Sequence, residues 1–185
     1  MNMIVSPYCT IGPYFPASFV AGCDDLTQHH GKTAQGQHVV LTGRILQEGG
    51  VPTRNTILEI WQPDAKGIFR HSLDPRCREA DPGFRGWGRA RTDSEGWYRI
   101  KTVLPGSYDS RCPHANLMVL AIGLTHRLVT TVFFADNPDS VKDPVLDCVT
   151  DAAARRRLFA RCESAGEYRF DLILRGENET PFFVD

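Results

Sequence analysis

Short runs of alternating or continuous apolar residues, each closed by glycine or proline, dominate the chain. Two such runs are 38–46 (HVVLTGRIL) and 56–61 (TILEIW), and the turn-forming residues 49–52 (GGVP) lie between them. Both runs are rich in β-branched and aromatic side chains, which favour an extended backbone. The pattern therefore predicts two neighbouring strands of one sheet.

Other parts of the chain show the same kind of pattern. Further strands are predicted at 97–103, 117–122, 128–134, 168–174 and 180–184. The run 117–122 has no polar interruption, so we expect it to be buried on both faces. One helix is expected at 151–160, because Asp151 can cap its first turn and alanines 152–154 favour helix.

Many short strands with little helix indicate the fold class. They predict a mainly β protein, a single-domain β-sandwich of mixed strands with long loops and one short helix. The 185 residues are enough for one domain with a sizeable core. The longest expected loop, 63–88, has little strand character, and loops of this length are usually functional or interfacial.

Composition and charge narrow the range of partners. The chain is 42% hydrophobic and 23% charged, as ordinary folded proteins are. A net charge of −1 gives no long-range field for nucleic acid or an anionic membrane. No window reaches the roughly 20 apolar residues of a membrane span, and the N-terminus does not resemble a signal peptide. We therefore expect a cytoplasmic protein with no nucleic-acid or membrane partner.

The cysteines do not indicate a metal site. No two of them have the short spacing of a zinc site, and a reducing cytoplasm would keep all of them as thiols. The six are Cys9, Cys23, Cys77, Cys112, Cys148 and Cys162.

Several segments, in their order and spacing, resemble the intradiol ring-cleavage dioxygenases of the protocatechuate 3,4-dioxygenase kind. The segments are 10–15 (TIGPYF), 58–67 (LEIWQPDAKG), 86–89 (GWGR), 104–108 (LPGSY), 143–146 (DPVL), 169–171 (RFD) and 176–183 (GENETPFF). The last of them resembles the α-type subunit of such enzymes. Because the match runs over nearly the whole chain, the resemblance implies this family's fold and a role in its chemistry.

The resemblance also implies where a ferric ion would be held in a catalytic member. That ion takes two tyrosinate oxygens and two histidine nitrogens, and the matching positions here are Phe69, Tyr108, His114 and Asn116. Phe69 has no oxygen to donate, and Asn116 offers an amide in place of an imidazole. We therefore expect no catalytic residue, metal ligand set or cofactor in this chain, with Tyr108 and His114 kept as hydrogen-bonded structural residues.

An α-type subunit implies a partner. The resemblance implies a homologous β subunit that binds Fe(III), in an (αβ)n assembly, with residues 1–36 as an N-terminal arm packed on it. Within this arm, Thr10, Gly12, Pro13 and Tyr14 match a segment that lines the shared substrate pocket, and a purely structural turn at the interface is an equal alternative.

One further position carries information on the substrate. Ile122 stands where the family's α subunit has an arginine associated with the aromatic substrate. Ile122 provides no cation, so a carboxylated catechol must be recognised by another residue, or the substituent differs and is, for example, a sulfonate.

These observations lead to one hypothesis and two alternatives. The hypothesis is an α-type, iron-free subunit of an enzyme that cleaves a protocatechuate-like catechol with O₂ to a cis,cis-muconate derivative in aromatic-compound degradation. The first alternative is a stand-alone iron dioxygenase with another ligand set, including His71 or Asn116. The second is a purely structural or interaction protein on the same sandwich, since a fold does not determine a function.

Overall fold

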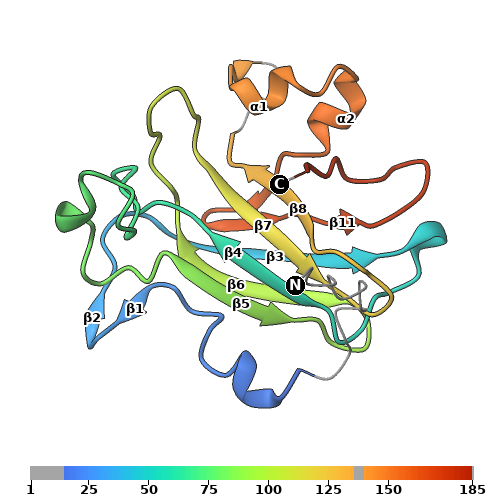
Figure 1. The fold of residues 1–185 in the computed structure, drawn as a ribbon, viewed down its shortest axis with the longest axis horizontal. Helices are drawn as coiled ribbons and strands as arrows, with labels where there is room; N and C mark the ends of the chain where they lie inside the picture. The colour runs from blue at the N-terminus through green and yellow to red at the C-terminus, as the bar shows by residue number, and fades with distance from the viewer. Residues whose placement is uncertain (1–14, 136–139, 185) are drawn as a thin grey trace, which may run out of the picture.

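Two β-sheets and a small set of peripheral elements form the part of the chain that the computed structural model describes, residues 15–135 and 140–184 (Figure 1). The first sheet contains β3 (His38–Leu46), β6 (Trp97–Val103), β9 (Arg161–Ser164), β10 (Glu167–Arg169) and β11 (Leu172–Ile173). The second contains β4 (Ile57–Trp61), β5 (Trp87–Arg91), β7 (His114–Leu120) and β8 (Leu128–Phe133). The peripheral elements are β1 (Gln28–His29), β2 (Lys32–Thr33), α1 (Pro144–Asp147), α2 (Ala152–Arg156) and 3-10 turns at Ala17–Phe19, Glu48–Gly50 and Cys77–Glu79.

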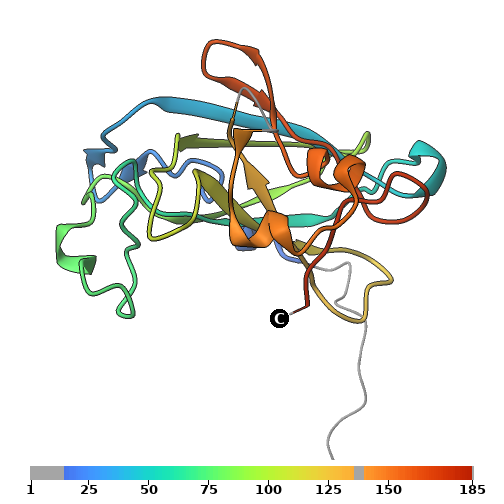
Figure 2. The ribbon, with the colours of Figure 1, turned by 90° about the horizontal axis from the view of Figure 1, so that it is seen from above.

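The main core lies between the two sheets. Alternate residues of β3, such as Leu41 and Ile45, face alternate residues of β4 and β7, such as Ile60 and Leu117, and all four are fully buried. In Figure 2, β3 (blue) runs along one side of the molecule and β4 (teal) lies below it. Strand β3 is antiparallel to β6 and parallel to β10 and β11. The predicted mainly β sandwich of mixed strands is therefore confirmed.

The expectation of one helix is wrong in number and length. Helix α2 ends at Arg156, because the residues that follow it pair with the end of β8. Phe133 N donates to Leu158 O, and Ala160 N donates to Phe133 O. Helix α1, which was not predicted, has only four residues. It starts where the Asp143 side chain accepts from Val145 N and Pro144 occupies the first turn. So short a helix has no apolar periodicity to reveal it.

The predicted strand at 168–174 is interrupted. Strands β10 and β11 both pair with β3, but Phe170 and Asp171 between them leave the ladder. Gly43 allows this close approach, since a Cβ there would lie 1.8 Å from Phe170 O. The buried Tyr98 hydroxyl also donates to Phe170 O. The predicted strand at 180–184 is reduced to a bridge between Phe183 and Val129.

Strand β7 differs from its prediction at both ends and on one face. It begins at His114, three residues earlier than expected, and ends at Leu120. Ala115, Leu117 and Val119 face the core, whereas Asn116 and the other residues on its alternate face are partly exposed, except His114. The strand is therefore buried fully on one face only. Strand β5 was not predicted, because its glycine and arginines lack strand propensity.

The described part of the N-terminal arm, residues 15–36, packs on its own chain. Leu26 is fully buried in the main core, Arg89 N donates to Cys23 O, and Lys101 N donates to Asp24 O. Of the cysteines, Cys9 lies outside the described residues, and the other five are free thiols. Within the described ranges, no helix is long and apolar enough to cross a membrane.

Two loops lie together at one end of the sandwich, 62–86 (green) and 104–113 (yellow-green), on the same side in Figures 1 and 2. The buried carboxylate of Asp64 holds the first loop by accepting from the backbone N–H of Lys66, Ile68 and Asp81. Asp64 O accepts from Gly106 N in the second loop. The predicted loop at 63–88 is thus ordered, and it lies against the segment that carries Tyr108.

Candidate functional site

A close glycine contact brings the two loops together at the site. Gly67 has a φ of +76°, and a Cβ there would lie 2.0 Å from Ser107 O, so this position requires glycine. As a result, the Phe69 and Tyr108 rings meet edge to face, with their centroids 4.9 Å apart and an interplanar angle of 82°. Phe69 and Tyr108 are 39 positions apart in the chain, and the fold brings them together.

The four positions matched to iron ligands converge in the structure. The Tyr108 hydroxyl lies 3.2 Å from His114 Nε2, and Asn116 follows His114 on the same face of β7. Phe69, Tyr108 and Asn116 line a cleft with a volume of about 410 Å³. The other residues of the cleft are Trp61, His71, Leu73, Asp74, Pro75, Arg76 and Asp109. The geometry therefore defines one site, built on β4, β7 and two loops.

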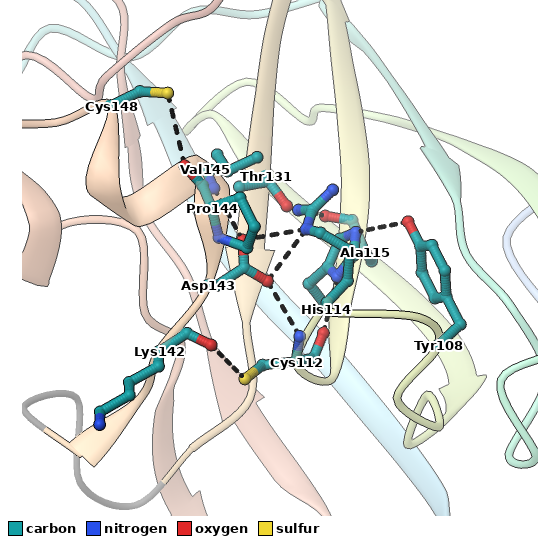
Figure 3. A network of polar contacts seen from close by, with 11 residues as sticks. Tyr108, Cys112, His114, Ala115, Thr131, Lys142, Asp143, Pro144, Val145 and Cys148 are labelled. Carbon is teal, nitrogen blue, oxygen red and sulfur yellow. Dashed lines mark hydrogen bonds and ion pairs between the residues drawn. The ribbon is translucent and has the colours of Figure 1, made fainter.

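Tyr108 and His114 form a neutral pair. His114 is 1% exposed, and its Nδ1 donates to Cys112 O over 2.7 Å. Its Nε2 is then the acceptor for the Tyr108 hydroxyl, and both contacts are drawn in Figure 3. Burial lowers the pKa of His114 and raises the pKa of Tyr108. Both shifts favour an uncharged imidazole and an uncharged phenol.

The residues present do not fit a ferric ion. Two of the four positions, Phe69 and Asn116, have no phenolate or imidazole, and Tyr108 and His114 are committed to each other. A raised Tyr108 pKa also opposes the phenolate that Fe(III) would require. His71 lines the cleft, but its Nδ1 accepts from Leu73 N.

A buried ion pair between Arg111 and Asp143 lies beside the Tyr108–His114 pair, and its contacts are dashed in Figure 3. Both carboxylate oxygens of Asp143 lie 2.9 Å from Arg111 Nε, and Asp143 also accepts from Cys112 N and Val145 N. The carboxylate thus ties the segment before His114 to helix α1. Sequence reasoning noted the segment 143–146 only as a family motif, and the only signal for this role was its acidic residue ahead of a proline.

Replacing Tyr108 with phenylalanine is expected to lower the free energy of unfolding by about 1–2 kcal/mol, because His114 Nε2 would be left buried without a donor. Urea unfolding measures this change. In a His114→Leu background, which has no acceptor to lose, the same Tyr108→Phe change should cost little. Equal costs in the two backgrounds would show that the hydrogen bond does not stabilise the fold.

The lowered pKa of His114 predicts a pH dependence of stability. The unfolded chain takes up this proton near the ordinary pKa of 6.5, whereas the folded chain resists it. The contribution of His114 is therefore fully present above pH 6.5 and is lost as the pH falls towards the folded-state pKa. Urea unfolding between neutral and mildly acidic pH should show this slope, and His114→Gln should remove more of it than the control His29→Gln, at a partly exposed position. An unchanged slope in His114→Gln would contradict the assignment.

The residues expected to line a partner's pocket are placed differently. Thr10, Gly12, Pro13 and Tyr14 lie outside the described residues. Ile122 is 50% exposed and lies in the turn after β7, at the opposite end of this strand from His114. It therefore belongs to no cleft with Phe69 and Tyr108. Trp61 also lines the cleft and is 37% exposed.

Comparisons with known proteins relate the chain to dioxygenases. A family model described as dioxygenase matches residues 10–120. The chain is 38% identical to the protocatechuate 3,4-dioxygenase beta chain of Burkholderia cepacia, over 85% of this chain and 73% of that one. It is 34% identical to the alpha chain of Pseudomonas putida, over 81% and 77%, and 31% identical to the alpha chain of B. cepacia, over 96% of both.

Solved structures agree in fold. Catechol 1,2-dioxygenase from Acinetobacter sp. ADP1 matches with a TM-score of 0.60 and 24% identity, over 94% of this chain and 64% of that one. An intradiol ring-cleavage dioxygenase from Tetranychus urticae matches with a TM-score of 0.59 and 19% identity, over 95% and 98%. From its sequence, its fold and its relatives, the chain belongs to the intradiol ring-cleavage dioxygenase family.

Proposed function

We propose that this chain is the α-type, non-iron-binding subunit of a heteromeric intradiol dioxygenase. Its partner is a homologous β subunit that holds Fe(III) and cleaves a protocatechuate-like catechol with O₂ to a cis,cis-muconate derivative. In this proposal the present chain stabilises that subunit and shapes the entrance to its pocket, and the assembly works in the cytoplasm in aromatic-compound degradation. The single-domain organisation of residues 1–185 is part of the same proposal.

The observation that carries the proposal is the donor set of the cleft. Of the four converging positions, only Tyr108 and His114 have a side chain that binds Fe(III), and these two are hydrogen-bonded to each other. Identity to known chains does not separate the subunit types, because beta and alpha chains both match over most of this chain. The donor set supports the α-type role on chemical grounds, since a β-type role requires ligands that Phe69 and Asn116 do not provide.

The position of the N-terminal arm supports a pocket shared with a partner. Ile57 pairs with Leu120 of β7 and with Arg91 of β5, so these residues mark one end of the second sheet. Arg91 donates to the backbone oxygen of Phe15, the first described residue, and Ile122 follows Leu120 at this end. Phe15 and Ile122 therefore lie towards the same end of the second sheet, which supports a joint role for Thr10, Gly12, Pro13, Tyr14 and Ile122 in lining a partner's pocket.

Co-expression with an intradiol-type chain that has both tyrosines and both histidines tests the proposal. The two chains should elute as one complex, with about one iron per pair. In this complex, Ile122→Arg should lower the KM for a carboxylated catechol and leave the KM for catechol unchanged. The control Thr125→Arg, exposed in the same turn, should change neither. Separate elution of the two chains would contradict the subunit role.

A further inference from the structure

A second groove lies on the outer face of the second sheet, over β4, β5 and β7. Its volume of about 350 Å³ falls in the range of small-molecule sites. Trp61 lies directly opposite Trp87 in the β4–β5 ladder, so the two indoles share this face, and Met118 adds a third apolar side chain. In the described structure its lining includes no residue of 104–113, so the groove is distinct from the site around Tyr108.

Two arginines line this groove, and among the described residues no carboxylate does. Arg70 Nη2 donates to the backbone oxygen of Asp81 over 2.7 Å. Arg85 Nη1 donates to Gly22 O over 2.8 Å, and its Nη2 lies 3.8 Å from Cys23 Sγ. Within residues 15–135 and 140–184, neither guanidinium forms an ion pair with a carboxylate. Since a guanidinium has five N–H donors, both arginines can bind a further acceptor.

The carboxylates closest to this groove are committed elsewhere. The Asp81 side chain accepts from the backbone N–H of Gln35 and Gly83. Glu59 lies on the same face of the second sheet, but its carboxylate is paired with Arg89 Nε. The positive charge of the groove therefore has no dedicated counter-ion in the described part of the chain.

Charge and apolar surface are adjacent in this groove. The Arg85 guanidinium lies over the Trp87 ring, 5.7 Å from its centroid. Burial lowers the pKa of His29, and the neighbouring His30 and the charges of Arg70 and Arg85 lower it further, so the positive field extends to β1. An anion with an apolar body would satisfy both the arginines and the indoles.

We propose that this groove binds a small organic carboxylate, with its apolar body on Trp61 and Trp87 and its charge on Arg70 and Arg85. Arginine suits this role because its planar guanidinium can hold a carboxylate through two hydrogen bonds. The site requires neither iron nor a partner chain, so it goes beyond the proposed subunit role and does not depend on it.

Titration of the full chain at neutral pH with hexanoate, hexanol and hexylammonium tests the inference. Two of the three tryptophans line the groove, so tryptophan fluorescence follows binding. Hexanoate should bind at one site with a Kd on the order of 1 mM, at least about fivefold more tightly than hexanol. Hexylammonium has the same apolar body with the opposite charge, and it should bind more weakly than hexanol.

A matched pair of variants locates the bound anion. Arg85→Gln should weaken hexanoate about fivefold and leave hexanol unchanged, and the hexanol result also reports that the apolar surface remains formed. The control Arg99→Gln removes the same charge from an exposed position of β6, in the first sheet, and should change neither.

Three results would overturn the inference: hexanol binding as tightly as hexanoate, hexanoate binding unaffected by Arg85→Gln, or hexanoate excluded from the complex with a β-type chain. The last result would assign the groove to acidic side chains of the partner. Failure of the two chains to associate would end the proposed function without changing the titrations of the isolated chain, so the two failures are distinguishable.

Discussion

Replacing Asp143 with alanine is expected to lower the free energy of unfolding by about 3–5 kcal/mol. Its side chain is fully buried, and it accepts from Arg111 Nε and from the backbone N–H of Cys112 and Val145. The Arg111 side chain is only 19% exposed, and its Nη2 has no partner among the described residues. Removing the carboxylate therefore leaves a mostly buried cation and two amides uncompensated.

Asp151 provides a matched control for this change. It also caps a short helix, by accepting from Ala153 N and Ala154 N, but its side chain is 65% exposed. Asp151→Ala should cost about 1 kcal/mol, as the loss of an exposed cap usually does. Urea unfolding of both variants measures the difference. An Asp143→Ala cost no greater than that of Asp151→Ala would show that the buried ion pair does not hold the segment before His114.

The second large effect is a gain of metal binding. The proposal that four positions correspond to an iron ligand set predicts that Phe69→Tyr with Asn116→His makes this chain bind about one Fe(III). The two substitutions add a phenol and an imidazole beside Tyr108 and His114, which already converge on the cleft. A ferric ion would then offset the raised Tyr108 pKa by stabilising the phenolate. Metal analysis and the visible absorption of an Fe(III)–tyrosinate measure the gain.

The controls for this gain are the two single variants and the double variant Phe69→Leu with Asn116→Gln. Each single variant should bind iron far more weakly than the double, since it supplies three donors, and the Leu/Gln variant should bind none. If the Tyr/His variant folds but takes up no more iron than the Leu/Gln variant, the four positions are not the remains of a ligand set.

Much of the fold could be predicted from apolar periodicity. The strands at 38–46 and 97–103 match β3 and β6, because along most of their length buried residues alternate with more exposed ones. The interruption at Phe170 could not be predicted, since it depends on Gly43, 127 positions earlier in the chain. Only a glycine there leaves room for the Phe170 carbonyl. Helix α2 stops early for a similar reason, because β8 offers its edge to residues 158–160. The local pattern of apolar and polar residues cannot reveal either of these long-range contacts.

The site could be predicted only in part. The resemblance identified Phe69, Tyr108, His114 and Asn116, and the structure brings them to one place. The resemblance could not show that Tyr108 donates to His114, because that hydrogen bond depends on the strand geometry of β7 and on the Cys112 carbonyl. Nor could it show that Trp61 and Asn116 face each other, because that register depends on the pairing of β4 with β7.

The iron content of the isolated chain, measured together with its ring-cleaving activity, tests the central claim most directly. We expect far less than one iron per chain, no tyrosinate–iron absorption and no cleavage of catechols, with activity arising only when an iron-bearing β-type chain is present. Full iron occupancy together with ring cleavage by this chain alone would contradict the subunit role and would establish a stand-alone dioxygenase.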